Sequence, residues 1–314
     1  MTLLAYIFAV LKNAIYGLSV FFTGALSDSV DVLDILALRF LLSFVILFVL
    51  KLFGIVKISV KIKEIFLVTR RRKAMKNLLL AALFEPVIEI FFETLGISMT
   101  TSVTAAVILS LSPVANCVSE SLILKEKTTL LQKVFLGIGI VGVAYIALNT
   151  DTSTGKDSVA GILCIILAGV FGSLYMVFSR KSRSHFNALE ITYTSAFMGM
   201  IFFNGANIIR HLLAGDVKYY FVPYFDIGNL IGFLYLAVVS SVLATCMNNF
   251  ALGRMQASTM SAFGGFSTLV TVVAGVFLNN EPIYYFHYIG FALILIRMIG
   301  VSYISIKKEK MKNA

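Results

Sequence analysis

Ten apolar stretches, each long enough to cross a lipid bilayer as a helix, follow one another along this chain of 314 residues. A crossing helix needs about 20 mostly apolar residues. Strands are a poor alternative, because the stretches are too long and lack alternation with a period of two. The sequence therefore predicts an all-α membrane protein with ten transmembrane helices, at roughly 3–25, 33–55, 76–96, 101–124, 130–149, 159–179, 188–211, 227–250, 257–279 and 284–306.

The composition agrees with lipid as the main solvent of this chain. Apolar residues make up 59% of it and charged residues 13%, whereas a soluble domain has about 25% charged residues. So few charged residues cannot cover an apolar core of this size with a soluble surface. We therefore expect an integral, multi-pass protein embedded in the bilayer.

The distribution of basic residues predicts the orientation in the membrane. With a cytoplasmic N-terminus, twenty Lys and Arg residues fall on the inner connections and tail, and three fall on the outer connections. Such an excess places both termini in the cytoplasm. It also explains the net charge of +10 without a nucleic-acid partner. The basic segment 56–75 is expected to lie along the inner membrane surface, and 307–314 to form a basic cytoplasmic tail.

Residues 1–149 and 157–306 read as two copies of one five-span unit, aligned without a gap at an offset of 155 positions. An odd number of spans in each copy forces the second copy to enter the membrane upside down. Inverted repeats recur in secondary transporters, which bind their substrate near the midplane between the copies. The matched positions are sparse and include Ala5 with Ala160, Gly17 with Gly172, Thr104 with Thr259, and Glu126 with Glu281.

The expected third span contains three carboxylates at four-residue steps, Glu85, Glu89 and Glu93. Each step rotates about 40° around a helix, so the three side chains share one stripe. A charge at the centre of a span costs about 2.5–3.5 kcal/mol, and the stripe must therefore face protein or water. We predict that it lines a central cavity and binds a cationic or zwitterionic substrate or exchanges a proton. A purely structural network of ion pairs is the alternative.

Three basic residues, Lys12, Arg39 and Arg297, also lie inside expected spans. The rise along each helix places Arg39 level with Glu93 and Lys12 near Glu85. We predict that these basic residues are charge partners of the acidic stripe, and that Lys12 and Arg39 are structural partners rather than substrate ligands.

Two prolines interrupt expected spans, Pro86 in the third and Pro113 in the fourth. Each removes a backbone hydrogen bond and frees a carbonyl about one turn earlier. Amide side chains lie near Pro113 and in the eighth span, where one of them aligns with Glu93 of the first repeat. These amides join the candidate binding residues: Asn116, Asn248 and Asn249.

The sequence contains no signature of an enzyme or of a cofactor site. Its three cysteines lie inside expected spans, and its histidines lack the spacing of metal ligands. We find no ATP-binding or dinucleotide-binding loop and no nucleophile elbow. We therefore expect no metal, no cofactor and no enzymatic activity.

Several short motifs occur in a characteristic order along nearly the whole chain. They are Tyr16-Gly17, Arg39-Phe40, the segment GISMTTSVTAAVILSLSPV, the segment KEKTTLLQ with Glu126, and the segment NEPIYYFHYIG with Glu281. In this order they resemble the drug/metabolite transporter superfamily, and within it the EamA-like branch. The resemblance implies ten spans in two inverted repeats and movement of a solute through a central cavity, often export.

The chain departs from that pattern at two positions in the fifth and tenth spans. Phe135 replaces the Gly expected nine residues after Glu126, and Arg297 stands where a small residue is usual. The second departure concerns the packing of the tenth span.

From these features we expect a secondary transporter of the cell membrane. It would move a small-molecule substrate (an amino acid, a polyamine or an organic cation) by alternating access, and would export it. The alternative is a membrane-embedded sensor or enzyme that uses the intramembrane carboxylates. The sequence does not determine the substrate, the coupling ion or the oligomeric state.

Overall fold

Helices form the architecture of the protein in our computed structural model, which describes residues 2–60, 72–125, 129–149, 158–254, 260, 263–279 and 284–313. Glu126, Thr259, Glu281 and most of the basic segment 56–75 lie outside these residues. In chain order the helices are α1 (Thr2–Ser27), α2 (Val32–Leu52), α4 (Arg72–Ala82), η1 (Leu83–Ile88), α5 (Glu89–Ser98), α6 (Ser102–Leu109), α7 (Ser112–Ser119), η2 (Glu120–Leu124), α8 (Leu130–Asn149), α9 (Val159–Ser182), α10 (Ala188–Ala214), η3 (Val217–Tyr219), α11 (Val222–Phe225), α12 (Ile227–Leu234), η4 (Tyr235–Ala244), α13 (Thr245–Leu252), α15 (Gly264–Asn279) and α16 (Tyr285–Asn313).

The predicted all-helical fold class is confirmed for the described part of the chain. Five helical stretches are long and apolar enough to cross a membrane: Leu4–Ser27, Val32–Leu52, Ser102–Leu124, Val159–Ser182 and Ile227–Leu252. Three shorter apolar stretches lie within the expected fifth, ninth and tenth spans: Leu130–Gly142, Gly264–Leu278 and Tyr288–Val301. The full count of ten spans remains a prediction.

Both prolines interrupt their helices, as the sequence predicts. The helix around Pro86 widens into η1, and Glu85 leaves the helical region with φ −128° and ψ 121°. The helix is interrupted here because proline has no N–H to continue the hydrogen-bond pattern. In the fourth span α6 ends at Leu109 and α7 begins at Ser112, one residue before Pro113.

Helices at equivalent positions of the two repeats pack against each other in opposite directions. In α2 and α10, the Asn207 side chain contacts Asp34, whereas Gly199, two turns earlier in α10, contacts Phe40, which lies later in α2. In α8 and α16, the residue number likewise falls along one helix as it rises along the other. Antiparallel packing of equivalent helices is the arrangement expected of an inverted repeat.

The two departures in the fifth and tenth spans are accommodated by glycines on the facing helix. The ring of Phe135 in α8 fills the space that a Cβ on Gly300 of α16 would need. In the same way, the side chain of Arg297 in α16 covers Gly139 of α8. A large residue on one helix thus packs against the smallest residue on the other, and the pair retains close contact.

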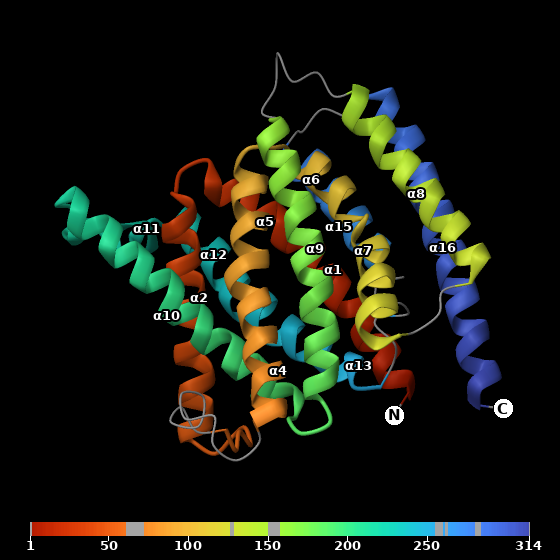
Figure 1. Ribbon diagram of the computed structural model, residues 1–314. Coiled ribbons are helices and arrows are strands. Elements are labelled where there is room, and N and C mark those ends of the chain that lie inside the picture. Colours follow the sequence, from red (N-terminus) through yellow and green to blue (C-terminus); the bar gives the residue numbers. More distant parts are fainter. Residues whose placement is uncertain are drawn as a thin grey trace.

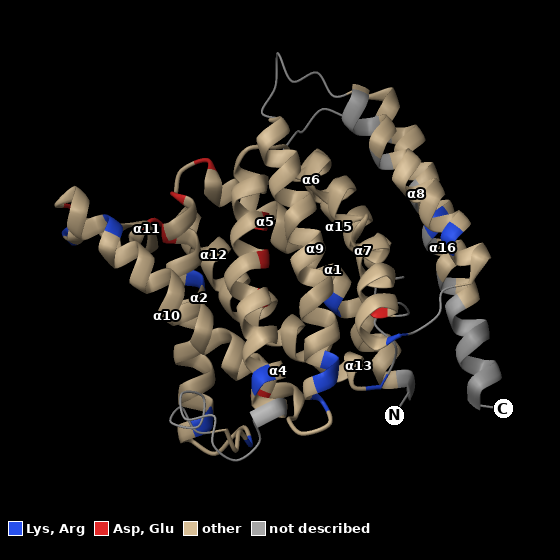
Figure 2. Cartoon of the chain, viewed as in Figure 1, with Lys and Arg blue, Asp and Glu red and all other residues tan. Residues whose placement is uncertain are grey.

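The N-terminus of α1 and the C-terminal end of α16 lie at the same end of the bundle (Figure 1). Lys and Arg residues gather at this end, whereas acidic residues near the start of α2 lie at the opposite end (Figure 2). α8 and α16 form an antiparallel pair along one side of the bundle, and α10 extends beyond the body on the other side (Figure 1).

A buried carboxylate ties α2 to α10 at the end remote from the termini. Asp34 accepts hydrogen bonds from the Asn207 amide at 2.8 Å and from Arg210 at 2.6 Å, and His211 Nε2 lies 3.0 Å from its Oδ1. The side chain of Asp34 is 11% exposed. Asp31, one turn earlier, contacts the same arginine at 2.9 Å but is 53% exposed.

We predict that Asp34→Asn destabilises the protein by about 1–3 kcal/mol, because it removes a buried charged acceptor from several donors. The matched control Asp31→Asn should change stability by less than about 1 kcal/mol, because an exposed ion pair contributes little and asparagine caps a helix as well as aspartate. Thermal unfolding of the purified variants in detergent would measure both effects. Equal losses for the two variants would contradict the role assigned to Asp34.

Candidate functional site

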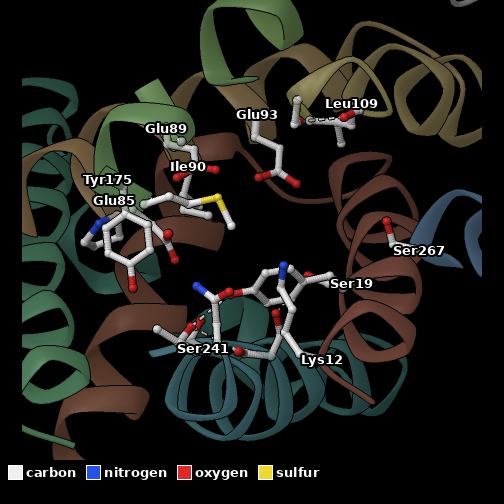
Figure 3. Close-up of a pocket in the computed structure, with 18 of the residues that line it drawn as sticks. Lys12, Ser19, Glu85, Glu89, Ile90, Glu93, Leu109, Tyr175, Ser241 and Ser267 are labelled. Atoms are coloured by element: carbon white, nitrogen blue, oxygen red, sulfur yellow. Dashed lines mark hydrogen bonds between the residues drawn. The ribbon is translucent and has the colours of Figure 1, made fainter. Parts of the chain in front are cut away.

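A cavity lies at the centre of the bundle and is lined by helices from both repeats (Figure 3). The first repeat contributes α1, α2, η1, α5, α6 and α7 to its wall, and the second contributes α9, α10, η4, α13 and α15. The polar and charged residues of the lining include Lys12, Asn13, Tyr16, Ser19, Arg39, Glu85, Glu89, Glu93, Ser110, Asn116, Thr192, Ser195, Ser240, Ser241, Thr245 and Asn248.

All three glutamates of the predicted stripe line this cavity, although the helix that carries them is irregular. Glu85 and Glu89 lie close enough for their carboxyl groups to interact with each other. Glu89 lies directly against Gly172 of α9, where a Cβ would collide with its carboxylate. The break at Pro86 turns the helix but keeps all three carboxylates on the cavity side.

Two of the three predicted basic partners lie across the cavity from the glutamates. Figure 3 shows Lys12 extending from the opposite wall, and its ammonium lies 4.5 Å from the centre of the Tyr16 ring. Arg39 donates to Ser241 Oγ at 2.7 Å and to Ser240 Oγ at 3.2 Å. The hydroxyls of η4 therefore hold the guanidinium in place within the bundle.

The acidic and basic groups share the lining of one cavity. Three acidic groups face two basic groups in the lining, which leaves a formal excess of one negative charge if all five are ionised.

Arg297 differs from its predicted role as a partner of the acidic stripe. It is 1% exposed and does not line the cavity. Its Nη1 donates to the backbone carbonyl of Ser110 at the break between α6 and α7. The carbonyl exposed by this break therefore provides its partner, and the guanidinium supports the cavity wall from behind.

The three predicted amides separate into two groups. Asn116 and Asn248 line the cavity. Asn249, the next residue, instead joins three helices, because its Oδ1 accepts from Tyr175 at 2.8 Å and Ser179 at 2.6 Å, and its Nδ2 donates to Thr192 at 3.1 Å. The expectation that Asn249 faces the cavity is not met, since consecutive residues of a helix point about 100° apart.

The cavity also includes side chains that the sequence did not single out as binding residues. The sequence could have identified Asn13 and Tyr16 as cavity residues, because they are polar and lie within about one turn of Lys12 in an apolar span. The sequence could not have identified Tyr175 and Met176 in this way, since aromatic and methionine side chains are ordinary components of helix packing. No group of His, Cys, Asp and Glu suited to a metal ion occurs among the described residues.

We predict that alanine substitutions at two neighbouring asparagines affect different properties, stability in one case and transport in the other. Asn249→Ala should lower stability by about 2–4 kcal/mol, because it leaves buried hydroxyls without their partner. Asn248→Ala should change stability by less than about 1 kcal/mol and impair transport, because the Asn248 Oδ1 has no hydrogen-bond partner within the protein. Thermal unfolding would measure stability, and substrate uptake normalised to the amount of folded protein would measure transport. The assignment is wrong if Asn248→Ala is the more destabilised variant.

Comparison with known proteins agrees with this architecture. Residues 3–148 and 159–303 each match the EamA-like transporter family. The chain is 32% identical over 305 residues to the uncharacterized transporter YcxC of Bacillus subtilis (strain 168), covering 97% of this chain and 94% of that protein. It is 25% identical over 221 residues to an uncharacterized transporter of Archaeoglobus fulgidus, covering 69% of this chain and 72% of that protein.

A solved crystal structure of another protein superposes with a TM-score of 0.64 and covers 98% of each chain. Its sequence identity of 14% limits this likeness to the fold. The family matches confirm the resemblance seen in the sequence motifs, since one family accounts for both halves of the chain. This chain therefore belongs to the EamA-like transporter family.

Proposed function

We propose that this membrane transporter binds a small metabolite with a cationic group in the central cavity and moves it by alternating access. An amino acid, a polyamine or an organic cation has the required charge. The observation that carries this proposal is the placement of Glu85, Glu89 and Glu93 on one cavity lined by both repeats. We further propose export as the direction, with both termini in the cytoplasm and ten spans in the cell membrane.

The charge balance of the cavity favours a cationic substrate. Glu85, Glu89 and Glu93 face Lys12 and Arg39, so the protein supplies one acidic group more than it supplies basic groups. An unbalanced charge in a membrane interior is unfavourable. A cationic group or a proton on one carboxyl offsets it, whereas a phosphate would add to the imbalance. The cavity therefore favours amines over nucleotide-linked substrates.

Alternating access fits the contribution of both repeats to the wall. Rocking one repeat against the other would expose the same site first to one side and then to the other. The sequence contains no ATP-binding loop. An ion gradient, exchange, or the substrate's own gradient would then drive the cycle. The basic residues at the end that holds the termini favour a cytoplasmic location for that end.

The first test replaces each cavity glutamate by its neutral isostere. We predict that Glu85→Gln, Glu89→Gln or Glu93→Gln lowers uptake at least about tenfold, because a lost charge contact with a cation is worth about 1.5–3 kcal/mol. The measurement is uptake into proteoliposomes of a labelled amine that first stabilises the purified protein in a thermal-shift screen. A change in the pH dependence of uptake would identify the carboxyl that exchanges a proton.

Glu120→Gln is the matched control, because Glu120 is also buried but pairs with Arg180 at 3.4 Å, outside the cavity lining. This control should retain uptake per folded protein. If all three cavity variants fold and transport with unchanged affinity, rate and pH dependence, the proposed function is wrong.

A second test moves a carboxylate without changing any charge. Gly172→Ala should lower uptake at least about threefold, because the new Cβ would collide with the Glu89 carboxylate and displace it. Gly169→Ala, one turn earlier in α9, should have little effect, since the nearest atom to its Cβ would be the Ser112 hydroxyl at 3.7 Å. Equal uptake by the two folded variants would contradict a role for the position of Glu89.

A further inference from the structure

Lys12 carries a positive charge into the cavity without a hydrogen-bond acceptor from the protein. The residue is 8% exposed and lines the cavity, and Figure 3 shows its side chain extending from the wall opposite Glu93. Its ammonium lies 4.5 Å from the centre of the Tyr16 ring. It forms no hydrogen bond and no ion pair with any residue that the structure describes. The three N–H donors of this ammonium are therefore open to a ligand.

The polar residues next to Lys12 on α1 are bonded to other groups. Asn13 Nδ2 donates to the backbone carbonyl of Ala9 at 2.6 Å. The Tyr16 hydroxyl lies 3.2 Å from Thr245 Oγ1. This part of α1 thus offers the ammonium an aromatic ring and no hydrogen bond.

Arg39, the other basic residue of the lining, is held in a different way. Its Nε donates to Ser241 Oγ at 2.7 Å, and its Nη2 donates to Ser240 Oγ at 3.2 Å. These two bonds fix the guanidinium against η4 and make it part of the wall. Of the two cations, Lys12 is the one whose donors remain unused within the described part of the chain.

An ionisable residue inside a membrane protein commonly marks the path or the site of a ligand. A buried charge is favourable only when it is paired and hydrogen-bonded, and contact with one aromatic ring compensates for part of that cost. Water can supply the missing acceptors while no substrate is bound. A substrate that displaces this water binds well only if it brings acceptors of its own, and a carboxylate provides the strongest ones.

We propose that Lys12 binds a carboxylate of the substrate, so that the transported molecule is a zwitterion with its ammonium toward Glu85, Glu89 and Glu93. The inference rests on the proposed function and narrows its substrate class, because a polyamine or a simple organic cation lacks the group that Lys12 would bind. It gives Lys12 a role in binding, in place of the structural role expected from the sequence. A zwitterion adds no net charge, so a proton on one glutamate offsets the excess acidic group of the lining.

The first test compares amino acids with the amines that remain when the carboxylate is removed. The pairs are leucine with 3-methylbutylamine, phenylalanine with 2-phenylethylamine, and ornithine with the diamine putrescine. Their dissociation constants are measured at pH 7 by titration calorimetry on the purified full-length protein in nanodiscs. We expect at least one amino acid to bind about tenfold or more tightly than its own amine, because a hydrogen bond between charged groups is gained.

Two results would overturn the inference. One is that every amine binds at least as tightly as its amino acid, and the other is that none of the three amino acids binds. Binding of the amines alone would leave the proposed function intact. If none of the six ligands binds and the glutamate variants also transport normally, both the inference and the proposed function are wrong.

Substitutions of Lys12 test whether this residue is the source of the preference. Lys12→Met should reduce the affinity ratio between an amino acid and its amine at least about fivefold, because it removes the ammonium and keeps a long side chain. Lys12→Gln repeats the measurement with a polar side chain if the methionine variant does not fold. Lys12→Arg keeps the charge and should retain a preference for the amino acid.

Lys181→Met is the matched control, because Lys181 also lies near an aromatic ring, 5.5 Å from the centre of Phe178, but outside the cavity lining. This control should leave the affinity ratio unchanged. If Lys12 only balances the charge of the glutamates, its loss would change the affinities for the amino acid and the amine alike. An unchanged ratio in folded Lys12→Met or Lys12→Gln protein would therefore overturn the assignment.

Discussion

The cost of placing charge in hydrocarbon is the constraint on which the rest of this structure depends. Glu85, Glu89 and Glu93 would be prohibitive on a lipid-facing surface. The fold places them inside the bundle, opposite Lys12 and Arg39 and within a wall built by both repeats. The central cavity thus holds these five intramembrane charges, and its polarity follows from their burial.

Two of the spans that form the cavity wall are irregular helices. Pro86 widens the third span at Glu85, and Pro113 separates α6 from α7. Each break leaves backbone groups that need partners in a membrane interior. At the second break the backbone carbonyl of Ser110 accepts a hydrogen bond from Arg297. Arg297, which the sequence predicted to be a charge partner of the acidic stripe, therefore satisfies a backbone group of the cavity wall instead.

The repeat also explains why unusual residues are tolerated outside the cavity lining. Equivalent helices pack in antiparallel pairs, and a bulky residue on one can face a glycine on the other. Phe135 faces Gly300, and Arg297 faces Gly139. A departure from the family pattern on one helix is therefore matched by space on its partner, which preserves the close approach of α8 and α16.

The sequence by itself determined the helical class, the family, the repeat offset and the set of intramembrane charges, because hydropathy, spacing and the cost of buried charge act along the chain. Only the tertiary structure decided which polar residues meet. Asn248 and Asn249 are adjacent in sequence, yet the first faces the cavity and the second binds Tyr175, Ser179 and Thr192. Which direction a side chain faces depends on the rotation of each helix against its neighbours. That rotation is set by packing among residues distant in the chain, which no local pattern records.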